Sequence, residues 1–149
     1  MDLHLRREEL SSAAQAHRLA DFLAEIATND QADPAMAARE LSGALCEALE
    51  LLAACPADGV LEISLRQRGD RLCADLAATA DPETRGALEA ARDALAAAPD
   101  LDALLQGASG HGGLAELALL HGVEVSIAVD ADRALVALAL PPQTLGMRP

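Results

Sequence analysis

Alternating apolar and polar residues in two pairs of short segments constrain the fold more than any other feature of this chain. In the first segment, Leu61, Ile63 and Leu65 fall on one face and polar residues on the other, which is the spacing of a half-buried strand. The four predicted strands cover about residues 61–66, 72–76, 123–129 and 133–140. Each pair encloses only a short turn, so both pairs are expected to be β-hairpins. This arrangement favours an antiparallel or mixed sheet over strict βαβ alternation.

Helical periodicity occupies the sequence before the first hairpin. Ser11 or Ser12 is expected to cap a first helix, whose predicted buried stripe consists of Ala16, Leu19, Phe22, Leu23 and Ile26. Asp33 and Pro34 give the cap-and-proline start of a second helix that runs to about residue 54. Its apolar residues Leu41, Leu45, Ala48, Leu49 and Leu52 recur at helical spacing. Both helices are therefore expected to bury one face.

The second half of the chain repeats these signals. Asp81 and Pro82 are expected to start an alanine-rich helix ending near residue 98, and a shorter helix is expected over residues 99–105. A glycine-rich loop over residues 106–113 precedes a predicted helix at 114–121. With a short edge strand at residues 1–7, the chain is predicted to be α+β: a two-layer sandwich with helices on one face of the sheet. Residues 1–140 are expected to form one domain, followed by a loose tail at 141–149.

Composition excludes several classes of function. The chain carries 24 acidic residues against 11 basic ones, a formal net charge of −13, so nucleic acid and anionic membranes are not expected partners. All the basic residues are arginines, and without lysine neither Schiff-base chemistry nor a P-loop can operate. With one Phe and no Tyr or Trp, the core must be aliphatic, and aromatic stacking on nucleobases is not expected.

Cysteine usage and the N-terminal residues predict a soluble cytoplasmic protein. Cys46, Cys55 and Cys73 form no C-x-x-C pair, and any single disulfide would leave one over, so they are interpreted as small core residues in a reducing compartment. Polar residues interrupt the start of the chain at Asp2 and His4, and no apolar run is long enough for a signal peptide or a membrane span. No metal-ligand spacing is present.

Two segments are candidates for chemistry. Glu47 lies in the second predicted helix, where its carboxylate could orient a water molecule or accept a proton. The glycine loop runs into a helix start, where backbone N–H groups favour an anion and glycine lets a phosphate approach closely. This loop comprises Gly110, His111, Gly112, Gly113 and Leu114. Each segment also has a simpler interpretation: Glu47 as an ordinary charge on a helix face, and the glycine loop as a simple lid or turn.

The order of these segments resembles the histidine-kinase-like ATPase superfamily with the Bergerat fold, and within it the compact anti-sigma-factor serine kinases. The resemblance covers about residues 3–140. It rests on the Glu-Ala-Leu box at Glu47, the hairpin after it, the Gly-x-Gly-Gly-Leu loop at 110–114 and the closing hairpin. It implies a Bergerat-type sandwich, Glu47 as general base, residues 110–114 as a phosphate loop, ATP with magnesium as cofactor, and a sigma factor as partner.

Two of the three nucleotide boxes depart from that family's pattern. The family places a magnesium-binding Asn four residues after the Glu, and this chain has Leu51, which cannot ligate a hard cation. The family's Asp-x-Gly-x-Gly box should follow the strand that ends near Leu76, but the chain reads Ala-Ala-Thr-Ala-Asp-Pro over residues 77–82. Asp75 and Asp81 are the candidates for the adenine-reading aspartate, and neither is followed by the glycines.

Three functions are consistent with this pattern. The favoured hypothesis is a regulatory protein that binds a protein partner (a sigma factor, an anti-sigma antagonist or another signalling protein) with no cofactor and a vestigial ATP site. The second is an active ATP-dependent protein serine kinase, which would need another residue to hold the metal. The third is a phosphotransfer or assembly module whose helix pair forms a dimer interface, with Leu19, Phe22, Leu23 and Ile26 partly exposed in the monomer and buried between subunits. Phosphotransfer would then pass through His17, although His17 has no acidic neighbour in the sequence to orient its ring.

Overall fold

The computed structural model describes the chain except residues 11, 53–55, 57–58, 98–111 and 143–149, and except the side chains of residues 13, 112, 113, 115 and 120. Its strands are β1 (Asp2–Arg6), β2 (Val60–Arg68), β3 (Arg71–Thr79), β4 (Glu124–Asp130) and β5 (Arg133–Ala139). Its helices are the 3-10 turn η1 (Arg7–Glu9), α1 (Ala13–Ala27), α2 (Pro34–Leu51), α3 (Pro82–Ala96) and α5 (Gly112–Leu120). The predicted helix at 99–105 and the tail at 143–149 lie outside the described residues.

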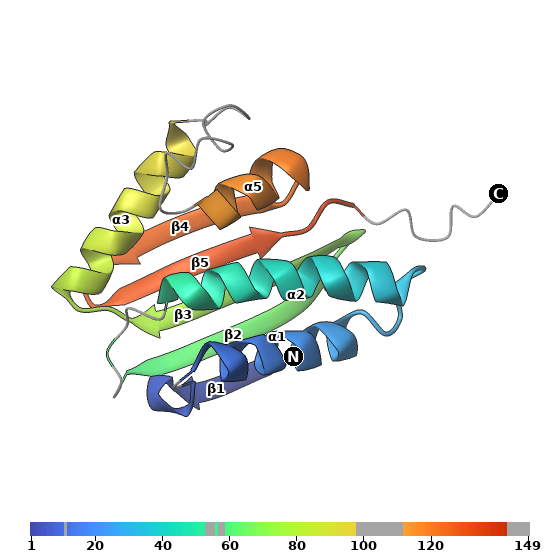
Figure 1. Ribbon diagram of the computed structural model, residues 1–149, viewed down its shortest axis with the longest axis horizontal. Coiled ribbons are helices and arrows are strands. Elements are labelled where there is room, and N and C mark those ends of the chain that lie inside the picture. The colour runs from blue at the N-terminus through green and yellow to red at the C-terminus, as the bar shows by residue number, and fades with distance from the viewer. Residues whose placement is uncertain (11, 53–55, 57–58, 98–111, 143–149) are drawn as a thin grey trace.

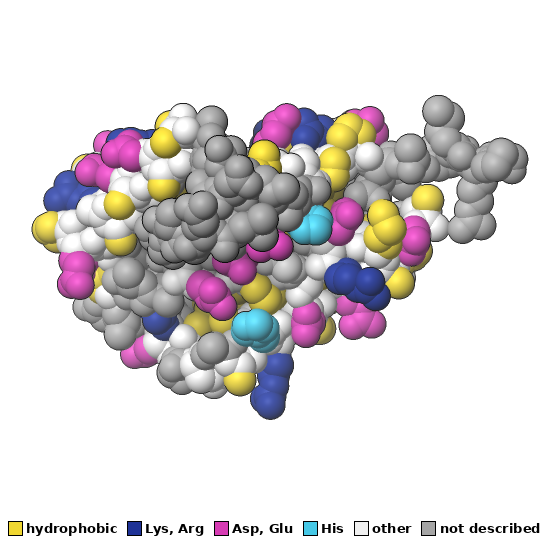
Figure 2. All heavy atoms as spheres, turned by 45° about the horizontal axis from the view of Figure 1, so that its top comes forward, with side chains coloured by type: hydrophobic (Ala, Val, Ile, Leu, Met, Phe, Trp, Pro, Cys, Tyr) yellow, Lys and Arg dark blue, Asp and Glu magenta, His cyan; other side chains and the backbone are white. Residues whose placement is uncertain are grey.

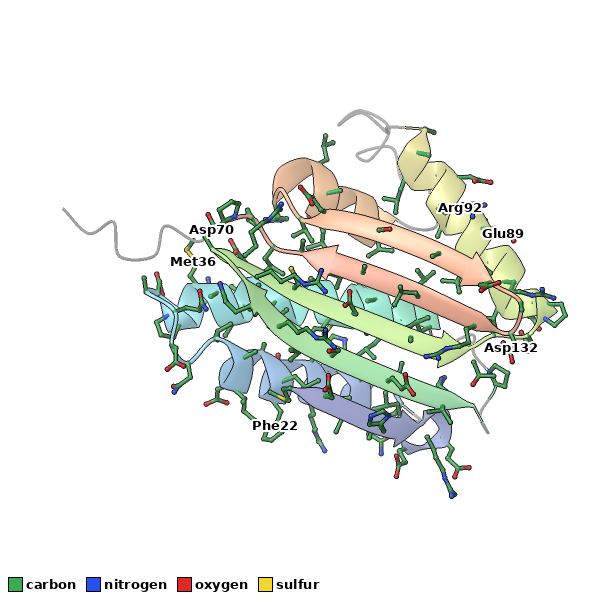
Figure 3. The ribbon with its side chains drawn as sticks, turned by 180° about the vertical axis from the view of Figure 1, so that it is seen from behind. Phe22, Met36, Asp70, Glu89, Arg92 and Asp132 are labelled. Atoms are coloured by element: carbon green, nitrogen blue, oxygen red, sulfur yellow. The ribbon has the colours of Figure 1, made fainter. Side chains whose placement is uncertain are left out.

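The five strands form one antiparallel sheet in the order β1-β2-β3-β5-β4. The β2–β3 turn contains Gly69 with a φ of 63°, a left-handed conformation that glycine adopts without strain. Helices α1, α2 and α5 lie over the same face of the sheet, and α3 runs beside β4 (Figure 1). The opposite face is seen in Figure 3 without a helix over it. The predicted α+β class and helix-covered face are confirmed, with an antiparallel rather than a mixed sheet.

An aliphatic core fills the space between the sheet and the helices. Each strand contributes alternate residues, such as Ile63, Leu76 and Val136, which lie opposite one another across three neighbouring strands. The apolar residues predicted for α2 are all buried. Alanines occupy much of the rest of the interface and are fully buried at Ala44 and Ala48. Small side chains at these positions allow α2 to lie close to its neighbours.

The predicted helix starts are confirmed by capping hydrogen bonds. The side chain of Ser12 accepts a hydrogen bond from the backbone N–H of Gln15, and Asp33 accepts one from that of Met36. Asp81 likewise accepts from the N–H of Thr84 at 2.8 Å, which lowers the pKa of its carboxyl. These short polar side chains satisfy N–H groups that have no partner inside the helix. Local sequence therefore determines where the helices begin.

The predicted buried stripe of α1 is wrong at two positions. Phe22 is 60% exposed and Ile26 is 47% exposed, whereas Ala20, Leu23 and Ala24 are buried. The helical spacing of the apolar residues is as predicted, but the buried face is centred on Ala20, Leu23 and Ala24. This face is rotated around the helix from the predicted one, because α1 packs mainly against α2 on one flank. The other flank, which carries Phe22, faces outward at the edge of the molecule (Figure 3).

Helix ends also differ slightly from expectation. α2 ends at Leu51 rather than near residue 54, and α3 ends at Ala96. Gly112 and Gly113 are the first two residues of α5, whereas they were expected in the preceding loop. Cys46 and Cys73 are half-buried free thiols, and Cys55 lies outside the described residues. In the part of the chain that the structure describes, no helix combines the length and apolarity needed to cross a membrane.

Candidate functional site

Glu47 lies on α2 with its side chain half-buried. Burial raises the pKa of its carboxyl above the usual value, and the negative charges of Glu50 and Glu116 raise it further. His17 acts in the opposite direction and lowers this pKa. Three carboxylates and one imidazole therefore share an electrostatic environment in which the ionised form of Glu47 is disfavoured. We call these four residues the acidic cluster.

The acidic cluster draws its members from three helices: His17 from α1, Glu47 and Glu50 from α2, and Glu116 from α5. Nothing in the sequence singles out Glu116. The helix containing it was predicted, but nothing in the local pattern indicates that this helix contacts α2. The structure brings α5, the helix after the glycine loop, into contact with the Glu47 helix, and this places the carboxylate of Glu116 near Glu47. Acidic side chains are spread widely over the helix-covered side of the molecule (Figure 2).

His17 has an acidic partner, contrary to the sequence interpretation. Its Nε2 atom lies 3.8 Å from Oε1 of Glu50, and both side chains are more than half exposed. The partner was missed because it comes from the neighbouring helix in space and not from an adjacent position in the chain. An exposed pair of this kind contributes little to stability, because water screens the two charges. The pair matters because it places a carboxylate close to one ring nitrogen of His17.

Leu51 and Leu114, the two leucines at positions compared above with the resembled family's boxes, both pack in or against the hydrophobic core. Leu51 is partly buried and packs against the core cluster, and Leu114 is 3% exposed. At the position of Leu51 the resemblance would require an oxygen donor for magnesium. The aliphatic side chain instead packs against the core cluster. Neither residue presents a polar atom to a ligand from its side chain.

The two aspartates considered for adenine recognition have other roles. Asp75 lies on the sheet face that carries no helix, since it alternates with the buried residues Ala74 and Leu76, and its carboxylate is 3.9 Å from Arg68. Asp81 caps α3 through the backbone of Thr84. The alternation of β3 and the Asp-Pro start signal were both readable in the sequence, and both exclude these residues from a pocket between the sheet and the helices.

The glycine loop is described only in part. Gly110 and His111 lie outside the described residues, and Gly112 and Gly113 start α5. Among the residues that the structure describes, no group of three His, Cys, Asp or Glu side chains could hold a metal ion. The acidic cluster can attract a cationic group or store a proton, but its negative charges oppose a bare phosphate.

Replacing Glu47 by Gln is expected to raise the free energy of unfolding at pH 7. The carboxyl has a higher pKa in the folded than in the unfolded chain, so ionisation at neutral pH opposes folding, and the amide removes that penalty. Lowering the pH protonates Glu47 in the parent protein, so the advantage of the variant should shrink. Thermal melts at pH 7 and pH 5 measure both effects.

The matched control for this variant is Glu89→Gln on the exposed surface of α3 (Figure 3), where little change is expected. A Glu47→Gln protein no more stable than the parent at pH 7 would contradict the electrostatic account of the acidic cluster.

Comparison of the chain with known proteins gives no assignment: no protein-family model matches it, and no curated protein matches it.

Proposed function

We propose that this chain is a regulatory protein of the histidine-kinase-like ATPase type that acts by binding a protein partner and has a degenerate nucleotide site. The finer fold assignment, a Bergerat sandwich, is part of this proposal. It is supported by the element order and by the glycine-led helix α5, which follows the first hairpin and precedes the second. The partner expected from the resemblance is a sigma factor, an anti-sigma antagonist or another signalling protein.

The environment of Leu51 is the observation that supports the proposal most. At the position where the resembled kinases hold magnesium, an aliphatic side chain packs against the core. Asp75 and Asp81 are engaged elsewhere, and the carboxylate of Glu116 adds negative charge near Glu47. Without a metal to neutralise it, a triphosphate would be repelled from such a site. A fold that has lost its nucleotide ligands can still present a surface to a partner.

The acidic surface favours a basic partner or a basic patch on one. With a net charge of −13, long-range attraction would accelerate association with a cationic surface and would weaken as salt screens it. Two purified components therefore suffice for a direct test: the chain and a candidate sigma factor from the same organism. Binding that weakens steeply with salt would agree with the proposal.

Millimolar ATP or ADP with Mg²⁺ is expected to leave the thermal melt of the purified protein unchanged. If the site still bound nucleotide, saturation at one hundred times the Kd would add about 2.7 kcal/mol and raise the Tm by several degrees. Melts with and without nucleotide, with magnesium present in both, make the measurement. A clear upward shift would contradict the degenerate site and favour the second hypothesis, an active serine kinase with Glu47 as its base.

One observation favours the third hypothesis as an alternative: His17 is exposed and has Glu50 beside its Nε2 atom. A carboxylate near an imidazole can orient the ring, which a phospho-accepting histidine requires. Acid-labile phosphate on the parent chain that is lost in His17→Ala would distinguish phosphotransfer from partner binding. Phosphorylation that survives His17→Ala would dispose of this alternative.

A further inference from the structure

The two edges of the sheet differ in whether another element lies beside them. The β4 edge has α3 beside it (Figure 1), and the two elements are in contact. At the other edge, β1 pairs with β2 on its inner side, and no described strand pairs with its outer side. An uncovered edge strand offers unpaired N–H and C=O groups to another chain. The β1 edge is therefore the place where the sheet can be extended.

The backbone groups available at this edge can be assigned from the register. Met1 and Leu65 exchange hydrogen bonds in both directions at 2.8 Å, and the N–H of Arg7 donates to the carbonyl of Gly59. Antiparallel pairing alternates, so the groups of Asp2, His4 and Arg6 point away from β2. The N–H of Arg6 is already accepted by a side-chain oxygen of Glu9 at 2.9 Å. As far as the described residues go, the remaining outward groups, centred on His4, are open to a second strand.

An apolar surface lies alongside this edge. Phe22 and Ile26 project from α1 and are exposed, and Figure 3 places Phe22 at the same margin of the molecule as β1. On the helix-facing side of β1, Leu3 and Leu5 are only half-buried. Phe22 is the one aromatic residue of the whole chain, and it contributes nothing to the core. A buried aromatic anchor is a common centre of protein interfaces.

The sequence of β1 is complementary to itself. If two copies of Asp-Leu-His-Leu-Arg pair antiparallel about a two-fold axis at His4, Asp2 of each lies opposite Arg6 of the other. Leu3 then lies opposite Leu5, on the side that the helices cover. In this pairing the two His4 residues exchange backbone hydrogen bonds, and the N–H of Asp2 in each copy donates to the carbonyl of Arg6 in the other. The N–H of Arg6 is not needed, so its hydrogen bond to the side chain of Glu9 can remain. Opposite charges face each other although each chain is strongly acidic as a whole.

We propose that the β1 edge together with the Phe22–Ile26 face of α1 is a homodimer interface, in which two copies form one continuous sheet. A five-residue strand by itself buries too little surface for a stable dimer, so the helix face is a required part of the interface. The two α1 helices would lie side by side across the axis, each covering Phe22 of the other. This inference does not rest on the state of the nucleotide site.

Sedimentation or light scattering over about 1 to 100 µM protein tests the interface. The parent chain is expected to reach twice its 15.4 kDa mass. Phe22→Ser should weaken dimerisation about tenfold or more, since truncating a central aromatic removes the anchor. Arg6→Glu, which places like charges opposite each other twice, should weaken it to a similar extent. Met36→Ser, an exposed apolar position at the start of α2 (Figure 3), is the control and should leave dimerisation unchanged.

The register is tested by His4→Cys. In a hydrogen-bonded antiparallel pair the two Cα atoms lie about 5.5 Å apart, within the range of a disulfide, so mild oxidation should cross-link the dimer. Ser126→Cys on β4 serves as the control and should not cross-link. A chain that stays monomeric throughout the concentration range would overturn the proposal, as would a dimer insensitive to both Phe22→Ser and Arg6→Glu. Melts of each variant verify that it is folded.

Discussion

Leu76→Ala is expected to lower the free energy of unfolding by about 2–5 kcal/mol, the usual cost of leaving a cavity in a close-packed core. Leu76 has no exposed surface and lies in β3, the middle strand of the sheet. Its cross-strand neighbours Ile63 and Val136 are themselves buried and held by their strands, so they cannot move in to fill the space. For a domain of this length the Tm should fall by about 3 °C for each kcal/mol.

Leu135→Ala is the matched control, because it is the same substitution in the neighbouring strand. Leu135 is 38% exposed and lies on the sheet face that carries no helix, so its truncation opens no cavity. Chemical denaturation of both variants compares the two faces of the sheet. Equal losses would mean that the helices do not cover the face assigned here, and the described core would be wrong.

Ala48→Leu is expected to destabilise the protein by about 1–3 kcal/mol, by overpacking rather than by leaving a cavity. Ala48 is fully buried on α2, one residue from Glu47. Leucine has the higher hydrophobicity and a comparable helix propensity, so only the lack of space can make it unfavourable here. The loss should appear as a lower midpoint of denaturation with an unchanged slope.

Ala90→Leu on the exposed side of α3 gives the control for propensity and hydrophobicity and should change stability little. If Ala48→Leu were as stable as the parent, α2 would not lie as close to the sheet as the buried alanines indicate. Because Ala48 neighbours Glu47, the same variant should also be checked for a change in the pH dependence described for the acidic cluster.

Much of the fold follows from local signals. Asp33-Pro34 and Asp81-Pro82 predicted helix starts that the capping hydrogen bonds confirm, since a short acceptor side chain satisfies the first free N–H groups wherever the helix later packs. Alternation in residues 61–66 predicted a strand and its buried face, because successive side chains of a strand point to opposite sides. The same alternation excludes Asp75 from a pocket under the helices.

Less of the candidate site could be predicted from the sequence. Glu47 could be selected from its helix, but its neighbours Glu116 and His17 come from α5 and α1, which are distant in the sequence. Periodicity predicts that a helix has a buried face, but the direction of that face depends on which neighbours cover it. Phe22 and Ile26 share the apolar spacing of α1 and were therefore expected in the core. They are exposed because no neighbouring element covers that flank of the helix in the described structure.

Short-range sequence patterns predicted the helix starts, the strand faces and the aliphatic composition of the core, because each depends on residues a few positions apart. Three features could be seen only in the tertiary structure: the exposure of Phe22, the outer edge of β1 with no described strand beside it, and the proximity of the four residues of the acidic cluster. These features depend on how separate elements pack. Packing is set by the sum of many weak contacts over the whole chain and leaves no short-range pattern in the sequence.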